Sequence, residues 1–367
     1  MSSAPTPAHV ATALADLNDT ILDWVVTLMR TPSVTGDEGA AQHVVATILA
    51  ELGLEVDVFV PDESLRSHPT FSDDGLPIDR PVVVATRRGS RPDAKSVIFN
   101  GHIDVVPTGA EAMFPHGAWT GAITDGALWG RGSCDMKGGL VAAIAGVAVL
   151  NHLGVDVPGD IIIQSVTGEE SGGVGTLAAV ERGYRADAAI IFEPTNLHVC
   201  PVGAGSASFR LHVDGRAAHG ARRHQGVSAI EKFFPLQQAL IEYEARRHAA
   251  FSHPAYRTND VVAPISVGTI SAGDWPSTVP DLLIAQGRAG VLPGELLEEA
   301  RAEFEAVIAD AAAQDEWLHD HPPCAEWFEG SLSRSNAVGC VTARPSWNYS
   351  PHHDRRSAAR RGCHLRL

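Results

Sequence analysis

The sequence predicts an α/β protein with a mixed, largely parallel sheet flanked by helices, and a smaller ferredoxin-like α+β domain inserted into it. Apolar, β-branched segments alternate with helical patterns over residues 1–199, which is typical of a sheet covered on both faces. Beyond residue 200 the order changes to β-α-β-β-α, which is most of a split βαβ unit. The length of 367 residues is ample for two domains.

The first segment of the predicted catalytic domain, residues 1–199, contains four helices and five strands. Amphipathic patterns predict two N-terminal helices joined by a turn at Thr31-Pro32-Ser33. Apolar runs bounded by helix breakers are typical of buried strands. The predicted helices cover residues 9–30, 37–52, 137–150 and 178–181, and the predicted strands cover residues 55–60, 82–86, 97–100, 160–167 and 188–192.

The inserted lid or dimerisation domain is expected over residues 200–313. Strands are predicted at 206–213, 261–270 and 282–291, and helices at 227–247 and 295–313. The chain is then expected to return to the catalytic domain over residues 314–333. Residues 334–367 form an atypical tail.

The composition excludes several classes of protein. A net charge of −16 argues against a nucleic-acid partner, which needs a basic surface. The longest apolar run, residues 140–150, is too short to cross a membrane, and the first ten residues do not resemble a signal peptide. Five cysteines without a Cys-x-x-Cys pair indicate neither a disulfide framework nor a thiolate zinc site. We therefore expect a cytoplasmic protein with no membrane partner.

Four histidine or carboxylate features follow predicted strands or the loops after them. They are His102 with Asp104, Asp135, the pair Glu169 and Glu170, and Glu193. Ligands of open α/β sheets bind outside the carboxyl ends of the strands, so these features should converge on one place. One histidine and several carboxylates suit Zn²⁺, or two cations when a carboxylate bridges them. An unneutralised carboxylate cluster would be costly, which also favours a bound cation.

Each feature taken alone also has a simpler explanation. His102 and Asp104 face the same side of an extended chain, where a carboxylate can orient a ligating imidazole, but such pairs are commonly plain hydrogen-bonded pairs. Asp135 could be a helix N-cap, and adjacent glutamates are usually solvated. Glu193 precedes Pro194 and could belong to an ordinary polar loop. The joint arrangement at one sheet edge is what favours a site.

Four motifs carry a resemblance to a known family. GHIDVVPTG, WGRGSCDMKGG, TGEESGG and FEPT follow one another in this order. Together they resemble the M20-type zinc metallopeptidases and N-deacylases, the group of acetylornithine deacetylase, succinyl-diaminopimelate desuccinylase and aminoacylase. The resemblance covers roughly residues 15–330 and implies an inserted lid or dimerisation domain.

The resemblance implies a set of metal ligands. His102 and Glu193 would bind one zinc ion, Glu170 would bind the other, and Asp135 would bridge the two. The family implies two Zn²⁺ ions per chain, with Co²⁺ as an alternative metal. Cations in such a site lower the pKa of water and polarise the amide carbonyl.

The resemblance also implies three catalytic residues. Asp104 would orient His102, and Glu169 would be the general base that takes a proton from the metal-bridging water and delivers it to the leaving amine. The oxyanion needs a further donor, which in the family is a lid histidine that reaches across a homodimer. His219 in GRAAHGARRHQG matches that motif, although taken alone it is more simply a surface histidine in a basic loop.

Two positions of the lid depart from the family pattern. Ser277 stands where the family often has Asn, and Gly290 stands where it often has Arg. Arg288 lies two residues before Gly290 on the same strand face and is a candidate ligand for a substrate carboxylate. These departures concern the substrate and leave the reaction class unchanged.

The last 34 residues differ from the rest in composition, with seven arginines, no lysine and one acid. The family's late histidine ligand of the second zinc is not found there. One hypothesis is a shifted reading frame with a premature stop, and the other is a variant tail in which His352 or His353 is the ligand. The first hypothesis predicts weak or substoichiometric zinc binding, little activity and an exposed sheet edge.

The leading functional prediction is zinc-dependent hydrolysis of the amide bond of a small N-acyl amino acid, similar to acetylornithine deacetylase. One alternative within the family is a dipeptidase or carboxypeptidase, with a dipeptide as substrate. The other is a catalytically defective paralogue that keeps the fold.

Overall fold

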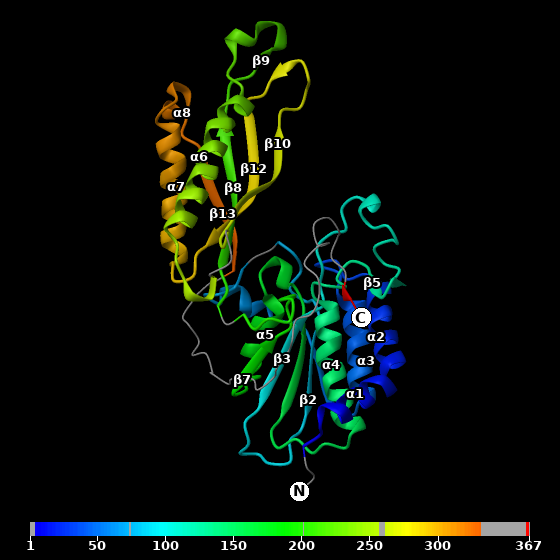
Figure 1. The fold of residues 1–367 in the computed structure, drawn as a ribbon. Coiled ribbons are helices and arrows are strands. Elements are labelled where there is room, and N and C mark those ends of the chain that lie inside the picture. The colour runs from blue at the N-terminus through cyan, green and yellow to red at the C-terminus, as the bar shows by residue number, and fades with distance from the viewer. Residues whose placement is uncertain (1–3, 73–74, 201, 257–260, 332–364, 367) are drawn as a thin grey trace. The chain divides into compact units, whose positions relative to one another are not determined.

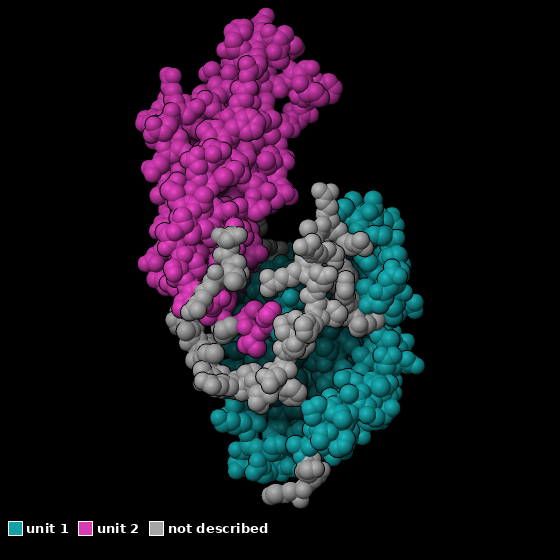
Figure 2. All heavy atoms as spheres, viewed as in Figure 1, with its two compact units in different colours: residues 1–71, 75–197, 346–367 teal, residues 72–74, 198–345 magenta. Residues whose placement is uncertain are grey.

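The protein divides into two compact units in the computed structural model, which describes residues 4–72, 75–200, 202–256, 261–331 and 365–366 (Figures 1 and 2). The first unit is built from residues 1–71, 75–197 and 346–367, and the second from residues 72–74 and 198–345. The predictions about residues 334–364, including His352 and His353, lie outside the described residues.

A five-stranded mixed sheet forms the centre of the first unit. In spatial order its strands are β1 (Glu55–Phe59), β2 (Val82–Arg87), β6 (Ile161–Val166), β3 (Val97–His102) and β7 (Ala188–Ile191). β3 pairs in parallel with β6 and β7, while β2 is antiparallel to both β6 and β1. Only β2 therefore runs against the other four strands, and the carboxyl ends of β6, β3 and β7 lie at the same edge.

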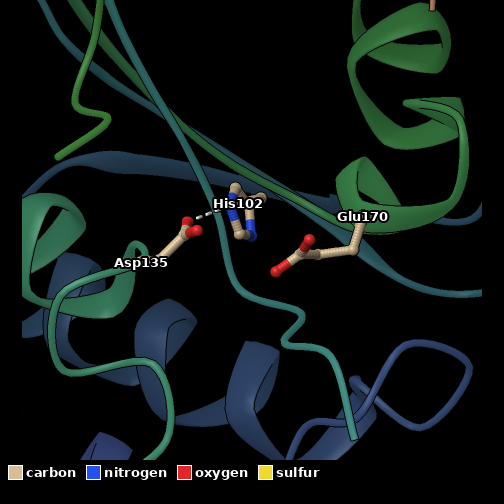
Figure 3. Close-up of side chains that lie close together, drawn as sticks. All are labelled: His102, Asp135 and Glu170. Carbon is tan, nitrogen blue, oxygen red and sulfur yellow. Dashed lines mark hydrogen bonds and ion pairs between the residues drawn. The ribbon is translucent and has the colours of Figure 1, made fainter. Parts of the chain in front are cut away.

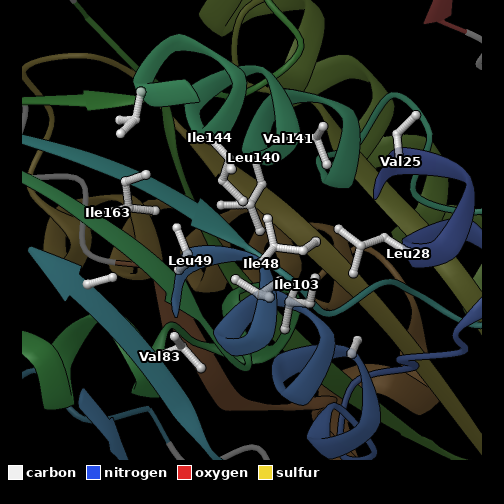
Figure 4. Close-up of a cluster of buried hydrophobic side chains, with 14 of the residues drawn as sticks. Val25, Leu28, Ile48, Leu49, Val83, Ile103, Leu140, Val141, Ile144 and Ile163 are labelled. Carbon is white, nitrogen blue, oxygen red and sulfur yellow. The ribbon is translucent and has the colours of Figure 1, made fainter. Parts of the chain in front are cut away.

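Helices cover both faces of this sheet. The helices of the first unit are α1 (Pro7–Asp16), α2 (Asn18–Arg30), α3 (Gly39–Glu51), α4 (Lys137–His152) and α5 (Val174–Glu181). Side chains of α2, α3 and α4 form one core with Val83 and Ile163 of the sheet (Figure 4). The alternate residues Val82 and Ile162 face the other way and pack with Ala179 of α5. Alternation along a strand thus supplies apolar side chains to two separate layers.

Two features of the first unit differ from the sequence prediction. The helix expected over residues 9–30 is divided at Leu17 into α1 and α2, because Asn18, Asp19 and Thr20 favour a helix start over a helix interior. β7 was expected to be a buried strand, but all four of its residues are exposed. It is the terminal strand of the sheet and, among the described strands, pairs only with β3. An apolar run does not distinguish an edge strand from a central one.

Short elements complete the first unit. A small sheet has the order β14 (Leu365–Arg366), β5 (Ala127–Trp129) and β4 (Ala122–Thr124). The short 3-10 helices are η1 (Glu63–Ser67), η2 (Glu111–Met113) and η3 (Glu169–Ser171). η3 contains two of the predicted site residues.

The second unit is an antiparallel sheet with two long helices. Its strands, in spatial order, are β10 (Ile265–Ala272), β12 (Leu282–Val291), β8 (Gly205–Asp214) and β13 (Cys324–Ser331). The helices α6 (Ala229–Ala250) and α7 (Leu297–Ala312) make the chain order β-α-β-β-α-β, a complete ferredoxin-like arrangement. The return to the catalytic domain expected over 314–333 is wrong for the described residues 314–331, because Leu318 packs in the core of this unit and β13 pairs with β8 inside it.

Packing in the second unit is one-sided. Alternate residues of β8 are buried, and Phe209 of β8 meets Phe304 of α7 with ring centroids 4.7 Å apart. The intervening residues, such as Arg210 and His212, lie on the face without helices and are partly exposed. The unit also contains β9 (Ala218–His219), β11 (Thr278–Val279), α8 (Glu316–Asp320), η4 (Gly220–Gln225) and η5 (Pro254–Tyr256).

The helices of the described part of the chain include none that is both long and apolar enough to cross a membrane.

Candidate metal centre

His102 is the centre of the predicted site and the last residue of β3. Its side chain is only 1% exposed. Nδ1 lies 2.8 Å from the backbone carbonyl oxygen of Asp104, and Nε2 lies 3.2 Å from Oδ1 of Asp135. An Nδ1–H that donates to a carbonyl directs the Nε2 lone pair of the neutral ring outward, where a metal can bind. Figure 3 shows Asp135 and Glu170 pointing toward His102 from opposite sides.

Asp104 is fully buried, and its carboxylate holds the turn that carries the two glutamates. Oδ1 accepts the backbone N–H of Glu169 and Oδ2 accepts that of Glu170, both at 3.1 Å. Oδ2 also accepts the hydroxyl of Thr35 at 3.1 Å. The expected contact with His102 is made mainly by the backbone carbonyl, while Oδ1 lies 3.6 Å from Nδ1. Asp104 therefore links the imidazole to the glutamate turn.

The turn after β6 brings the two glutamates to the sheet edge. Gly168 has φ +68°, and a Cβ there would lie 2.9 Å from a guanidinium nitrogen of Arg80. Arg80 is itself buried against Glu38, with Nη1 and Oε1 3.3 Å apart. A glycine is required at 168 both by the left-handed backbone and by this close packing.

The remaining carboxylates gather around the same imidazole nitrogen. Nε2 of His102 lies 3.7 Å from Oε2 of Glu169 and 3.8 Å from Oε1 of Glu193. Two sets of three residues have ligand atoms within 4.8 Å of one another: His102, Asp135 and Glu170, and His102, Glu169 and Glu193. One imidazole nitrogen with several carboxylate oxygens at these separations is a donor set that Zn²⁺ accepts.

The electrostatics of the cluster indicate a shortage of positive charge. Burial and repulsion from Asp135 raise the pKa of Glu170 to about 7. Burial, together with repulsion from Asp135, raises the pKa of Glu193 to about 7 as well. Burial lowers the pKa of His102, but its hydrogen bond to Asp135 and the surrounding carboxylates outweigh that effect and raise it to about 9. A divalent cation would replace these protons, so the residues present fit a metal.

Two predicted residues, His219 and Arg288, belong to the second unit. His219 is exposed, and its Nδ1 accepts the backbone N–H of Ala221 at 3.1 Å. In a neutral ring this leaves the proton on Nε2, which is then a donor. Arg288 is exposed on β12. At Gly290, a Cβ would lie 2.4 Å from the carbonyl carbon of Ala263, so no side chain fits at the position where the family resemblance implied an arginine.

Comparison with known proteins identifies the family. A family model described as peptidase family M20/M25/M40 matches residues 98–346. The chain belongs to this family. As an M20 protein it is an amidohydrolase or metallopeptidase, as the resemblance implied, and a mixed sheet flanked by helices is confirmed for it.

Relatives of this M20 protein include enzymes that remove small acyl groups. N-formyl-4-amino-5-aminomethyl-2-methylpyrimidine deformylase of Halalkalibacterium halodurans is 30% identical over 325 residues, or 85% of this chain and 72% of the relative. Succinyl-diaminopimelate desuccinylase of Methylorubrum populi is 36% identical over 226 residues, or 58% of this chain and 54% of the relative.

Among solved structures, the dipeptidase Dug1p of Saccharomyces cerevisiae has a TM-score of 0.67 and 16% identity. The likeness covers 89% of this chain and 80% of that one. At this identity it shows the fold alone.

Three residues that support the site were missed in the sequence. Thr35, Arg80 and Lys137 are buried or partly buried polar side chains whose contacts lie far away along the chain. The one signal for Lys137 was a lysine at the start of an otherwise apolar helix.

Proposed function

We propose that this M20 protein is a zinc-dependent N-deacylase that hydrolyses the amide bond of a small N-acyl compound, with an acetylornithine deacetylase-like reaction. The observation that carries the proposal is the meeting of His102 with four carboxylates at the carboxyl ends of β3, β6 and β7. Water is added across the amide, giving a carboxylate and a free amine.

The ligand roles follow from the positions of the side chains. We assign His102 and Glu193 to one zinc ion, Glu170 to the other, and Asp135 as the bridge. Its position supports that role, because Oδ1 of Asp135 lies 3.2 Å from Nε2 of His102 and Asp135 shares a set of ligand atoms within 4.8 Å with Glu170. Zn²⁺ bound there would polarise the substrate carbonyl and lower the pKa of water.

Glu169 is the proposed general base. Its carboxylate is half exposed, so it can reach both the solvent and the substrate side of the cluster. The backbone N–H of Glu169 is fixed by Asp104, which holds the start of its side chain in one place. Glu169 would take a proton from the attacking water and deliver it to the leaving amine.

His219 is the proposed oxyanion donor, acting within a homodimer formed through the second unit. The tautomer favoured by its contact with Ala221 leaves an Nε2–H for this purpose. Exposed apolar residues on α6, Ile230, Phe234 and Ile241, recur at helical spacing and support a second copy of the chain as partner. The edge strand β10 belongs to the same unit.

The substrate class rests on the relatives. The deformylase and the desuccinylase both remove a small acyl group from an amine, which favours deacylation over peptide cleavage. Arg288 is the proposed ligand for a substrate carboxylate. The second candidate is a dipeptidase activity, the alternative within the same family. We place the protein in the cytoplasm, since its scattered cysteines show no disulfide pattern.

A substrate panel tests this proposal. Zinc-loaded protein is offered four substrates in parallel: the N-formyl aminopyrimidine, N-succinyl-diaminopimelate, N-acetylornithine and a dipeptide. We expect chelator-sensitive release of amine from an N-acyl substrate at a higher kcat/KM than from the dipeptide. Faster cleavage of the dipeptide would favour the second candidate. Zinc binding without any hydrolysis would support a defective paralogue.

A further inference from the structure

Lys137 is a buried lysine that the proposed chemistry does not use. Its side chain is fully buried at the first position of α4. Nζ donates to the backbone carbonyls of Leu28 and Thr31, each at 2.9 Å, and lies 5.6 Å from the centroid of the Trp119 ring. Among the described residues, no carboxylate forms an ion pair with it. Burying a lysine amine against neutral groups alone costs free energy, which suggests that its position has a function.

The two carbonyls that Lys137 reaches belong to the C-terminal end of α2. The last carbonyls of a helix have no partner within the helix and carry the negative end of its dipole. An ammonium from α4 therefore caps α2 from outside. These hydrogen bonds join α4 to the end of α2: Lys137 is 109 residues from Leu28 and 106 residues from Thr31 in the sequence.

The segment fastened in this way contains Asp135. The backbone N–H of Lys137 donates to the carbonyl of Gly132 at 3.0 Å, which closes a loop around Asp135. Gly132 has φ +85°, and a Cβ there would lie 3.2 Å from Cδ of Lys137. Met136 is also fully buried, and its sulfur accepts the backbone N–H of His102 at 3.2 Å. The two residues after Asp135 are therefore both buried and hydrogen-bonded, which fixes the position of the chain that carries Asp135.

We propose that Lys137 is a positioning residue for the metal ligand Asp135: it ties the Asp135 loop to the end of α2 and so holds this carboxylate beside His102. The inference rests on the proposed function, in which Asp135 binds zinc. Residues that orient ligands typically change metal affinity by about 10- to 100-fold when they are removed. The change Lys137→Met would remove the desolvation cost of the lysine amine, and the Leu28 carbonyl would keep the N–H of Thr31 as a donor, so the cost to stability should be small. The two effects can therefore be separated.

The decisive variant is Lys137→Met, which keeps the length of the side chain and removes the donor. Zinc affinity is measured on the full chain by competition with a chromophoric chelator, and the thermal midpoint of the metal-free form is measured in parallel. We expect affinity to fall about 10- to 100-fold with little change in the midpoint. Leu28→Ala is the matched control, because it opens a cavity at the same end of α2 but keeps the carbonyl. It should lower the midpoint and leave zinc affinity unchanged.

The outcomes distinguish the inference from the proposed function. Unchanged zinc affinity in Lys137→Met overturns the role of Lys137 while the proposed function stands. An equal loss of zinc affinity in Leu28→Ala would also overturn the role of Lys137. Destabilising the end of α2 would then be enough to weaken zinc binding without any change to the lysine. A wild-type chain that binds no zinc, or an Asp135→Ala variant that binds it as tightly, overturns the proposed function.

A measurement on the wild type covers the case in which Lys137→Met does not fold. The N–H of Thr31 bonds to the carbonyl of Leu28, so its hydrogen exchange reports on the end of α2. Coupling between two sites is reciprocal, so zinc loading should slow exchange at Thr31 as well as in the Asp135 loop. Unchanged exchange at Thr31 on loading would overturn the proposal.

Discussion

The sheets of the two units differ in whether their polar side chains are buried. In the first unit, polar residues at or near the carboxyl ends of β3 and β6 are buried: Asn100, His102, Asp104, Gln164, Ser165 and Thr167. In the second unit, the polar residues of β8 alternate with apolar ones and fall on the face without helices. Burying polar groups costs free energy unless they are bonded, so the first pattern marks a place where chemistry outweighs stability.

The two units differ in what they contribute to the proposed reaction. The first unit holds the cluster around His102, and its supporting contacts come from within that unit. The second unit has an ordinary apolar core and contributes exposed groups such as His219. Variants in the two units should therefore affect metal affinity, turnover and stability in different combinations.

The largest expected effect is the loss of the proposed general base, Glu169. Glu169→Gln should lower kcat by about 10²- to 10⁴-fold, because the amide cannot take up the proton, while zinc affinity stays within a few-fold of wild type. Glu326→Gln, on an exposed carboxylate of β13 in the second unit, is the matched control and should keep full activity. Parallel loss of zinc and kcat in Glu169→Gln would identify Glu169 as a ligand instead.

The second unit should contribute to turnover without contributing to metal binding. His219→Ala should lower kcat by about 10²- to 10³-fold, because it removes the proposed oxyanion donor, with zinc content unchanged. If the histidine acts across a dimer, mixing His219→Ala with Glu169→Gln should restore about one quarter of wild-type activity through hybrid dimers. No recovery on mixing, at a proven exchange of subunits, would rule out action across the dimer.

Asp104 should affect metal affinity more than turnover per bound metal. Asp104→Asn replaces one carboxylate oxygen with an NH₂ group. This group would face the backbone N–H of Glu169 or Glu170, so the glutamate turn would lose a hydrogen bond. Zinc affinity should fall about 10- to 100-fold. Asp187→Asn is the control in the same unit, since Asp187 also accepts a backbone N–H, that of Ser96, but at the surface. Equal losses in both variants would contradict a specific role for Asp104.

The smallest effect expected is on the pH dependence of stability. The pKa values of Glu170 and Glu193 are raised from 4.5 to about 7, and that of His102 from 6.5 to about 9. These three groups bind more protons in the folded metal-free protein than in the unfolded chain, and the stability this gives is lost as pH rises through the folded values. Burial lowers the pKa of Lys137 from 10.5 to about 7, so above that pH Lys137 opposes the contribution of His102. The thermal midpoint of the metal-free form should therefore fall mainly between about pH 5 and 7.

Zinc loading provides the control for that pH series, because the metal replaces the protons and should flatten the fall. In the second unit, the pKa of Asp315 is shifted in the opposite direction, so its contribution to stability depends on pH in the opposite way. Its burial raises the pKa, but hydrogen bonds from Lys232 and the backbone lower it overall, so its contribution is lost only as pH falls. A metal-free midpoint that rises steadily from pH 5 to pH 7 would be incompatible with the raised pKa values of Glu170 and Glu193.

Much of the first unit could be predicted from local patterns. Strands β2, β3 and β6 are apolar runs between helix breakers, and the residues at or just after the ends of β3 and β6 identify the site edge. The supporting residues could not be predicted, because their contacts depend on tertiary packing. Thr35 reaches Asp104 across 69 residues and Lys137 reaches Leu28 across 109. Neither contact leaves a periodic signal in the sequence.

The errors in strand assignment have the same origin. β7 has the composition of a central strand, but its burial depends on its neighbours in the sheet, and Ile191 is 61% exposed. β13 pairs with β8 over a separation of more than 100 residues, so its unit could not be read from the local sequence. The position of Trp327 against Phe304 shows why it belongs there, since the aromatic ring completes the core of the second unit.

Zinc titration of paired histidine variants tests the central claim most directly. Metal-free wild type, His102→Ala and His212→Ala are titrated with Zn²⁺ and their bound metal is counted. His212 is a matched histidine on β8 that lies 3.5 Å from Glu326. We predict that wild type and His212→Ala bind zinc and gain amide hydrolysis, and that His102→Ala loses both. Tight zinc binding by His102→Ala, or hydrolysis that survives removal of the metal, would contradict a metal centre built on His102.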